Sequence, residues 1–291
     1  MGPHWKCYSD EELEVQYSPS KWSTREDAVG TYLDIIGKGS IHVRNTLECH
    51  LNIQYGDLSD EKVDIFCPAS LPKDAPVFVY IHGGYWQLNC LELNCYMAET
   101  FYKAGAATAT IGYAKAPSVS LAHITETIKK GVELVLQWAM DRGSRGVCIS
   151  GHSAGGQLVA MMLSHNWNKK FNGILKGVVP ISAVTDVRPV IRMSVNDALK
   201  ATEEEAWQYS PLNHVESAAL CNKEVEVLVV VGGLDSPEFI RQSKEYTDAL
   251  LAKGLSATYM ELPEIDHFQL VENLEDPHFP LTKTIFRMMG L

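Results

Sequence analysis

Ser153 stands in a setting that is typical of a catalytic nucleophile. Residues 151–155 read Gly-His-Ser-Ala-Gly, directly after the apolar run Val147–Ser150 and directly before a helix-like stretch rich in Leu, Val, Ala and Met. A strand that reverses into a helix within so few residues holds its apex residue in a strained conformation and exposes its hydroxyl, and small flanking residues are what such a turn requires. The pattern predicts that Ser153 attacks a carbonyl carbon.

A second short motif lies earlier in the chain, where residues 82–86 read His-Gly-Gly-Tyr-Trp directly after an apolar run. Attack by a serine on a carbonyl generates an oxyanion, and backbone N–H groups must already face it if they are to stabilise it. Glycines allow the backbone to approach that closely. We therefore expect the N–H groups of Gly83, Gly84 and Ala154 to be the oxyanion donors. His82 is interpreted as a structural residue whose ring ties the loop by hydrogen bonds.

The acid and the base of such a site should follow the nucleophile in chain order, each in a loop after a strand. Asp235 comes just beyond the apolar run at residues 227–234, where a carboxylate can orient an imidazole. His267 follows the apolar run Thr258–Leu262. The order Ser153, Asp235, His267 is the order of the α/β-hydrolases, and it predicts a catalytic triad.

Other acids and histidines fit these two roles less well. The competing residues are Asp186, Asp197, Asp266, His152, His214 and His278. Asp186 and Asp197 lie in or before a segment that we expect to be a cap. Asp266 adjoins His267 in sequence, where its side chain would diverge from the imidazole ring. His152 belongs to the turn around Ser153 itself, and His214 and His278 follow no predicted strand.

These roles predict the course of a reaction. The serine attacks a carbonyl while the histidine takes its proton, the aspartate stabilises the imidazolium, and the backbone donors hold the oxyanion. An acyl-enzyme forms, and water releases it. No cofactor is expected, and the sequence has no His-Glu-x-x-His or comparable set of metal ligands.

The elements that must position these residues alternate between short apolar runs and helical patterns. Strands are predicted at Val77–Ile81, Ala107–Tyr113, Gly146–Ser150, Gly177–Ile181, Val225–Val231 and Ala257–Leu262. Helices are predicted at Leu91–Ala104, Leu121–Met140, Gln157–Ser164, Glu238–Lys253 and Leu281–Met289. Continuous apolar strands between helices indicate an α/β protein with a mostly parallel sheet covered on both faces.

The remaining segments complete this organisation. The alternating pattern from Thr46 to Phe66 predicts two antiparallel strands at an edge of the sheet. Ser9 with Glu12 forms a capping box that starts a short helix ending near residues 18–19, and a second helix is predicted over Arg25–Ile36, on the spacing of its apolar residues. The helical, polar segment at about 187–209 is interpreted as a small cap, so residues 1–291 are expected to form one α/β-hydrolase domain.

Composition narrows the range of partners and locations. The chain has 291 residues, of which 46% are hydrophobic, so it can bury a sizeable core. Its formal net charge of −11, with no cluster of Lys and Arg, disfavours nucleic acid as a ligand. The sequence shows no secretory h-region and no apolar run of membrane-spanning length. We expect a soluble intracellular protein that does not bind membranes.

Several stretches of the sequence together resemble one enzyme family, kynurenine formamidase (arylformamidase). They are Tyr17–Ser20, His82–Trp86, Gly151–Gly155, Asp235–Phe239, Arg241–Glu245 and Asp266–Phe268. The resemblance therefore runs from the first helix nearly to the C-terminus. That family is similar to the hormone-sensitive-lipase-like esterases, which usually have three glycines after the histidine, whereas here Tyr85 occupies the third place. This difference favours the formamidase and leaves open whether two or three loop amides form the oxyanion hole.

The resemblance implies hydrolysis of N-formyl-L-kynurenine to L-kynurenine and formate, the second step of tryptophan breakdown, through a formyl-enzyme intermediate. Formyl is the smallest acyl group, and the leaving group is an aniline nitrogen that His267 can protonate. The candidates to contact the aromatic ring of the substrate are Tyr85, Trp86, Trp207 and Phe268. Arg188, Arg192 and Asn213 are candidates for its amino-acid end. The resemblance also implies a homodimer in the cytosol, with the nucleus as a second location.

Two other functions stay open at this level. A broad carboxylesterase acting on small aryl or short acyl esters would need the same nucleophile and oxyanion hole, and the His-Gly-Gly-Tyr-Trp loop is the feature against it. The second alternative is a protein of the hydrolase fold that binds a ligand without catalysis, because fold alone does not establish function. Such proteins usually lack a triad residue, and here all three positions are filled.

Overall fold

Eight strands form one sheet in the computed structural model, which describes residues 5–171 and 173–291. They are β1 (Cys49–Gln54), β2 (Lys62–Phe66), β3 (Val77–Ile81), β4 (Ala107–Ile111), β5 (Val147–His152), β6 (Leu175–Ile181), β7 (Glu226–Gly232) and β8 (Ala257–Leu262). Their spatial order is β1-β2-β4-β3-β5-β6-β7-β8. Strands β3 to β8 run parallel, whereas β2 is antiparallel to both of its neighbours. The predicted parallel strands and the predicted antiparallel pair at the edge are confirmed.

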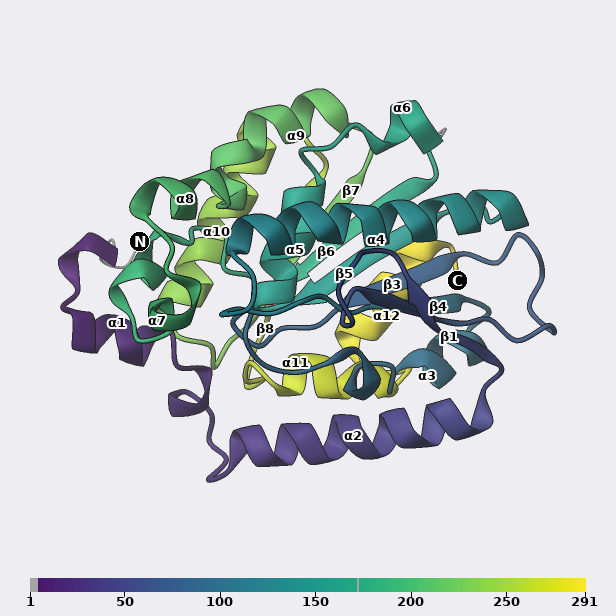
Figure 1. Cartoon of the computed structure of the whole chain (residues 1–291), viewed down its shortest axis with the longest axis horizontal. Coiled ribbons are helices and arrows are strands. Elements are labelled where there is room, and N and C mark those ends of the chain that lie inside the picture. Colours follow the sequence, from purple (N-terminus) through teal and green to yellow (C-terminus); the bar gives the residue numbers. More distant parts are fainter. Residues whose placement is uncertain (1–4, 172) are drawn as a thin grey trace.

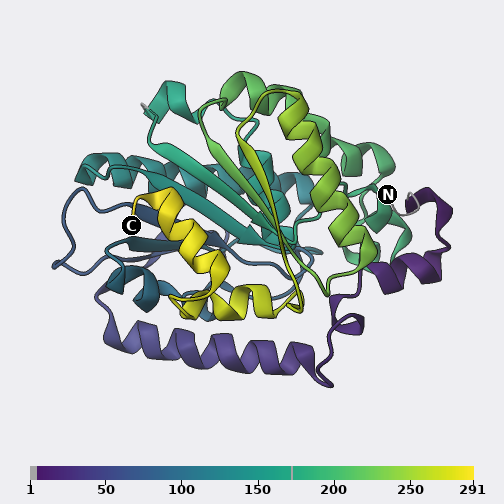
Figure 2. The same ribbon diagram turned by 180° about the vertical axis from the view of Figure 1, so that it is seen from behind.

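Side chains alternate across the sheet and thereby build two apolar layers. In β3, the side chains of Val77, Val79 and Ile81 join one layer, and those of Phe78 and Tyr80 join the other. The first layer is covered by α4 (Leu121–Arg142), α5 (Ala154–Met162) and α10 (Pro237–Ala252), which Figure 1 shows in front of or beside the sheet. The second is covered by α2 (Ala28–Thr46), α3 (Ala98–Lys103), α11 (Gln269–Glu272) and α12 (Pro280–Met289), as Figure 2 shows from behind. The central strands β3 to β7 are therefore buried on both faces, as their continuous apolar sequences predict, whereas the edge strands β1 and β8 are partly exposed.

The second predicted helix was placed correctly but was too short, and only part of its predicted apolar face is buried. Helix α2 begins after Asp27, whose side chain accepts a hydrogen bond from the N–H of Gly30, and it continues ten residues beyond the predicted end at Ile36, to Thr46. The spacing of Val29, Tyr32, Leu33 and Ile36 predicts one apolar face, and of these Tyr32 and Ile36 are buried, whereas Val29 and Leu33 are 43% and 41% exposed. The helix instead buries a stripe spaced by three or four residues along its whole length, namely Ala28, Tyr32, Ile36, Gly37, Ser40 and Val43.

The helix predicted over Leu91–Ala104 was wrong in its first half. A single 3-10 turn at Leu91–Leu93 is followed by a break, and α3 begins only at Ala98. Within the break, the side-chain amide of Asn94 donates to the backbone oxygen of Cys90 at 2.6 Å. Such a local bond from a side chain to the backbone competes with helical hydrogen bonding, which explains the interruption.

The other helices agree with the sequence to within a few residues at most of their ends. Helices α4, α5, α10 and α12 correspond to the four patterns after residue 120. Helix α1 (Asp10–Gln16) begins with the predicted capping box, in which Ser9 and Glu12 exchange side-chain and backbone hydrogen bonds. Helices α6 (Trp167–Phe171) and α9 (Val215–Cys221) were not predicted, because both are short.

The segment interpreted as a cap contains short helices that lie at one end of the molecule. These are η4 (Arg188–Arg192), α7 (Asn196–Leu199) and α8 (Glu203–Gln208). Helix α1 packs beside them, as Figure 1 shows, because Arg192 pairs with Asp10 at 2.7 Å and the N–H of Ser194 donates to the carboxylate of Glu14. The N-terminal helix and this segment thus form one continuous structure. Among the described residues, no helix combines the length and the apolar composition needed to cross a bilayer.

Candidate active site

Ser153 occupies the sharp turn between β5 and α5, as its motif predicts. Its backbone has φ 55° and ψ −117°, a conformation that residues with a side chain rarely adopt and that costs roughly 1–3 kcal/mol. A Cβ atom on Gly151 would lie 2.3 Å from the oxygen of Gly155, and a Cβ atom on Gly155 would lie 2.2 Å from the oxygen of Ile81. Gly151 is therefore required for β5 to turn closely into α5, and Gly155 is required for the turn to pack against the end of β3.

Asp235 and His267 meet at the carboxyl ends of β7 and β8. The Nδ1 atom of His267 lies 2.8 Å from Oδ1 of Asp235, and both side chains are almost fully buried. The other carboxylate oxygen, Oδ2, accepts hydrogen bonds from the hydroxyl of Ser182 at 2.5 Å and from the N–H of Gly232 at 3.1 Å. These contacts fix the plane of the carboxylate. Because Nδ1 donates to it, Nε2 of the imidazole is the nitrogen that can accept a proton.

The hydroxyl of Ser153 lies in the same buried region. Ser153 is 4% exposed and His267 is 3% exposed, and the ring of the neighbouring His152 lies 4.4 Å from the ring of His267, centroid to centroid. Within the described residues, the Ser153 hydroxyl makes no hydrogen bond in this conformation. A bond between nucleophile and base is often long without substrate and shortens in the complex, so this geometry is compatible with a catalytic pair.

The loop after β3 lies against Ser153. A Cβ atom on Gly83 would lie 3.0 Å from Cβ of Ser153 and 2.7 Å from the oxygen of His152, so only glycine fits this contact. Gly84 has φ 117°, and its carbonyl accepts the N–H of Leu88 at 2.8 Å, which closes the loop into a turn. The backbone at Gly83 is thus close enough to the serine for an oxyanion donor.

His82 ties this loop together, as its position suggests. Its Nδ1 atom bonds the oxygen of Gly83 at 2.8 Å, and its ring stacks on Tyr113 with centroids 4.4 Å apart. The hydroxyl of Tyr113 in turn donates to the backbone oxygen of His82 at 3.0 Å. Burial lowers the pKa of His82 to about 4, so the ring is neutral at physiological pH.

The structure places Trp86 where it cannot touch a substrate. Its side chain is fully buried, and its indole N–H donates to Oε1 of Gln157 at 3.0 Å, while the amide of Gln157 donates to the oxygen of Tyr209 at 2.8 Å. The expectation of a ring contact from Trp86 therefore has no support, because the aromatic ring anchors the loop in the core. Tyr85 is half-buried, and its hydroxyl donates to the backbone oxygen of Tyr17.

The other two aromatic candidates lie in different surroundings. Phe268 follows the base directly, and its ring packs against Tyr32 at 5.4 Å and His267 at 5.5 Å, between centroids. Trp207 lies on α8, where the guanidinium of Arg188 covers its ring at 3.9 Å. Phe268 is next to the site, whereas the contacts of Trp207 belong to the segment at 187–209.

The candidates for the amino-acid end of a substrate already have partners. The guanidinium of Arg188 pairs with Asp186 at 2.8 Å, and Arg192 pairs with Asp10. The side-chain amide of Asn213 donates to the oxygen of Trp207 at 3.1 Å. Any of these groups would have to exchange a partner in order to bind a substrate.

His152 is a residue of the site whose role the sequence did not show. Its Nε2 atom lies 2.9 Å from the backbone oxygen of His267. Burial lowers the pKa of His152 well below its usual value, so the ring is neutral and donates this hydrogen bond. His152 thereby fixes the backbone of His267 without placing a positive charge beside its imidazole.

Asp266 also holds the loop that carries His267, although it is not the partner of the imidazole. Its Oδ1 atom accepts the N–H groups of Phe268 at 2.9 Å and Gln269 at 2.8 Å. Ser23 and Arg25 reach the same carboxylate from the N-terminal part of the chain. Burial opposes its ionisation, but the hydrogen bond from Ser23, the backbone donors and the Arg25 cation together hold the pKa of Asp266 below its usual value.

Replacing Arg25 with alanine should lower the free energy of unfolding by roughly 2–4 kcal/mol, because the carboxylates of Asp266 and Glu272 would stay buried without their shared cation. Denaturant unfolding measures this change. The matched control is Lys38→Ala, which removes an exposed ion pair with Asp34 and should cost less than about 0.5 kcal/mol. Equal destabilisation by the two variants would show that the Arg25 cluster is unimportant.

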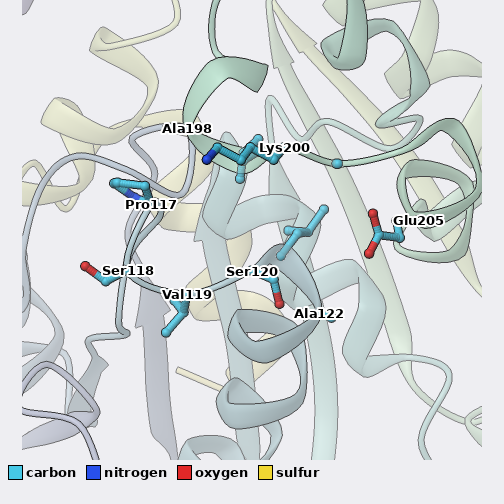
Figure 3. A pocket seen from close by; sticks show the side chains of 11 residues that line it. Pro117, Ser118, Val119, Ser120, Ala122, Ala198, Lys200 and Glu205 are labelled. Carbon is cyan, nitrogen blue, oxygen red and sulfur yellow. The ribbon is translucent and has the colours of Figure 1, made fainter.

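A pocket of about 300 Å³ lies between the segment at 187–209 and the loop before α4 (Figure 3). Ala198, Lys200 and Glu205 line it from one side, and Pro117 and Ser118 line it from the other. The three residues predicted as the triad do not line this pocket, which instead marks where the short helices meet the rest of the molecule. Across the described part of the chain, His, Cys, Asp and Glu side chains form no group that could hold a metal ion.

Comparisons with known proteins agree with this architecture. A family model described as BD-FAE matches residues 63–223, which include the Ser153 turn and end before Asp235. Kynurenine formamidase from Danio rerio is 33% identical over 98% of both chains, and the one from Salmo salar is 34% identical over 98% of both. The crystal structure of a candidate thioesterase from Silicibacter sp. TM1040 is 28% identical, with a TM-score of 0.78 over 96% of this chain and 99% of that one.

A more distant structure, an esterase from Pyrobaculum calidifontis, has a TM-score of 0.68 at 17% identity and covers 97% of each chain, which is evidence for the fold alone. The sheet order and these structural relatives define a hydrolase of the α/β-hydrolase fold. Identity to the two fish proteins extends over nearly the whole chain. The chain belongs to the kynurenine formamidase family.

Proposed function

We propose that this protein hydrolyses N-formyl-L-kynurenine to L-kynurenine and formate, as a step of tryptophan breakdown. The observation that carries the proposal is the buried contact between His267 and Asp235, next to Ser153, in a chain that aligns over its length with kynurenine formamidases. Full-length identity of this kind supports a shared substrate, and the buried contact supplies the chemistry that the substrate needs.

In the proposed reaction, Oγ of Ser153 attacks the formyl carbon while Nε2 of His267 takes the hydroxyl proton. Asp235 holds the imidazole by Nδ1 and stabilises its positive charge. The N–H groups of Gly83, Gly84 and Ala154 are proposed to stabilise the oxyanion. The C–N bond breaks as His267 passes the proton to the aniline nitrogen, which leaves a formyl-enzyme and L-kynurenine. His267 then activates a water that attacks this ester and releases formate.

The crowding around the nucleophile supports a small acyl group. The backbone of Gly83 approaches the Ser153 side chain so closely that an added Cβ atom would lie 3.0 Å from it, and both the serine and the base are nearly buried. A formyl group carries only hydrogen on its carbonyl carbon, so it needs less room there than any other acyl group. The same site could accept a short ester, which makes carboxylesterase activity the alternative.

The test compares hydrolysis of N-formyl-L-kynurenine, followed by the absorbance of kynurenine, with hydrolysis of phenyl acetate. We expect kcat/KM for the formamide to exceed that for the ester by at least about 100-fold, because the amino-acid end of the kynurenine leaving group can make contacts that phenol lacks. Turnover of the ester alone would support the same triad and would reject the formamidase activity.

The finer points of organisation are proposals of the same kind. We infer that the segment at 187–209, together with α1, acts as a cap over the site, since these elements pack together at one end of the molecule.

A homodimer in the cytosol follows from family resemblance, with the nucleus as a second location. Light scattering coupled to size-exclusion chromatography measures the mass of the assembly, and a monomer mass would reject the dimer.

A further inference from the structure

Three consecutive residues of the loop after β3 have an unusual backbone. Gly84, Tyr85 and Trp86 have φ values of 117°, 50° and 59°. Glycine adopts positive φ at little cost, whereas residues with a side chain do so only when their surroundings hold them there. The conformation of the loop beside Ser153 therefore depends on what binds the two aromatic side chains.

Both side chains are anchored by hydrogen bonds at their far ends. The indole of Trp86 bonds Gln157 on α5, within the core. The hydroxyl of Tyr85 donates to the backbone oxygen of Tyr17, at the end of α1. Burial raises the pKa of Tyr85 far above its usual value, so the phenol stays protonated and remains a donor. Because this hydroxyl is already engaged, it is not free to bind a substrate.

The acceptor of the Tyr85 hydroxyl is itself held firmly. Tyr17 is 1% exposed, and its own hydroxyl accepts from Nε2 of Gln242 at 2.5 Å and donates to Glu238 at 3.2 Å. Gln242 also accepts the N–H of Thr185 at 2.8 Å, in the loop after β6. The end of α1 is thus fixed to α10, the helix that begins two residues after Asp235, and the Tyr17 carbonyl has a defined position.

We propose that Tyr85 is a positioning residue, whose hydrogen bond to the Tyr17 carbonyl holds the neighbouring loop in the left-handed conformation that aims its N–H groups at the oxyanion. The inference rests on the proposed function to the extent that this loop supplies oxyanion donors. It assigns to the N-terminal helix a part in catalysis without any contact to the substrate. It also replaces the earlier expectation that Tyr85 binds the substrate's ring.

The first test is Tyr85→Phe, which removes only the hydroxyl. We expect kcat to fall about tenfold with KM within about twofold of the original, a smaller loss than the 10²–10³ that follows removal of an oxyanion donor itself. The rate at which a fluorophosphonate labels Ser153 should fall by a similar factor, because the phosphoryl oxygen uses the same donors. The matched control is Tyr55→Phe, whose hydroxyl also donates to a backbone oxygen, that of Gly112 at 2.6 Å, and it should change neither rate by more than about twofold.

A second pair of variants separates backbone conformation from side-chain contact. Tyr85→Gly should be at least about fivefold faster than Tyr85→Ala, because glycine adopts a φ of 50° without an anchor and alanine does not. A substrate-binding or purely packing role for Tyr85 would make the glycine variant equal to or slower than the alanine variant. That result would overturn the proposal.

The labelling measurement keeps this test separate from the test of the substrate. If the original protein fails to hydrolyse the formamide but is labelled at Ser153, the proposed substrate is wrong and the labelling rates still decide the role of Tyr85. Unchanged labelling of Tyr85→Phe would overturn the positioning role, as would a rise in KM for the formamide at constant kcat. A tenfold loss in both labelling and kcat, absent in Tyr55→Phe, would support it.

Discussion

Replacing Ser153 with alanine is expected to lower kcat for N-formyl-L-kynurenine by a factor on the order of 10⁶, which is the scale of loss when a serine nucleophile is removed. No other hydroxyl among the described residues stands at the strained turn between β5 and α5, so no neighbour can replace it. Kynurenine absorbance measures turnover, and a fluorophosphonate probe measures covalent labelling. Both signals should disappear together.

The control for this variant is Ser164→Ala, which removes a half-buried hydroxyl just beyond the other end of the same helix, α5. It should keep turnover within about twofold of the original, as substitutions away from special features usually do. If Ser153→Ala retained labelling or more than about a hundredth of the turnover, Ser153 would not be the nucleophile, and the proposed mechanism would fall with it.

The second large effect is expected from Asp235→Asn, which should reduce kcat by about 10⁴ while the fold is kept. The asparagine has nearly the same shape, but its amide group would favour the tautomer of His267 that carries its proton on the wrong nitrogen. The hydroxyl of Ser182 and the N–H of Gly232, which now donate to the carboxylate, would keep the side chain in place. Steady-state rates and a thermal unfolding curve together separate loss of function from loss of structure.

Asp197→Asn provides the comparison for the acid, because Asp197 was a competing candidate and lies exposed on α7. We expect the Asp197→Asn variant to hydrolyse N-formyl-L-kynurenine at the same rate as the original protein. Full activity in Asp235→Asn, or a large loss in Asp197→Asn, would assign the acid differently.

The places of Ser153, Asp235 and His267 in the fold could be predicted from the sequence, because each depends on a local pattern. The turn at Ser153 needs small residues at fixed spacing between a strand and a helix. Asp235 follows a buried strand and His267 follows a strand at the edge of the sheet, and both strands show in the sequence as short runs of strand-forming residues. The strand register then brings the last two side chains to the same edge of the sheet. None of these inferences required knowledge of contacts between distant segments.

The supporting residues could not be read in this way, because their roles depend on distant contacts. Ser182 bonds Asp235 across 53 positions of the chain, and His152 bonds the backbone of His267 across 115. Their residue types are common, and no spacing rule connects them with their partners. Trp86 was misjudged for the same reason, since only the position of Gln157 shows that the indole points into the core.

The pair between Arg25 and Asp266 joins residues 241 positions apart, and the bond between Tyr17 and Glu238 joins residues 221 apart. During synthesis on the ribosome, which proceeds from the N-terminus, the first segment must therefore wait until almost the whole chain has emerged before it finds its partners. Contacts of such separation also slow folding, because a long loop must close before they form. The contacts that hold the His267 loop and the acceptor of the Tyr85 hydroxyl are consequently expected to form last during synthesis. The proposed catalytic site is therefore complete only after the N-terminal segment has packed against residues 238–272.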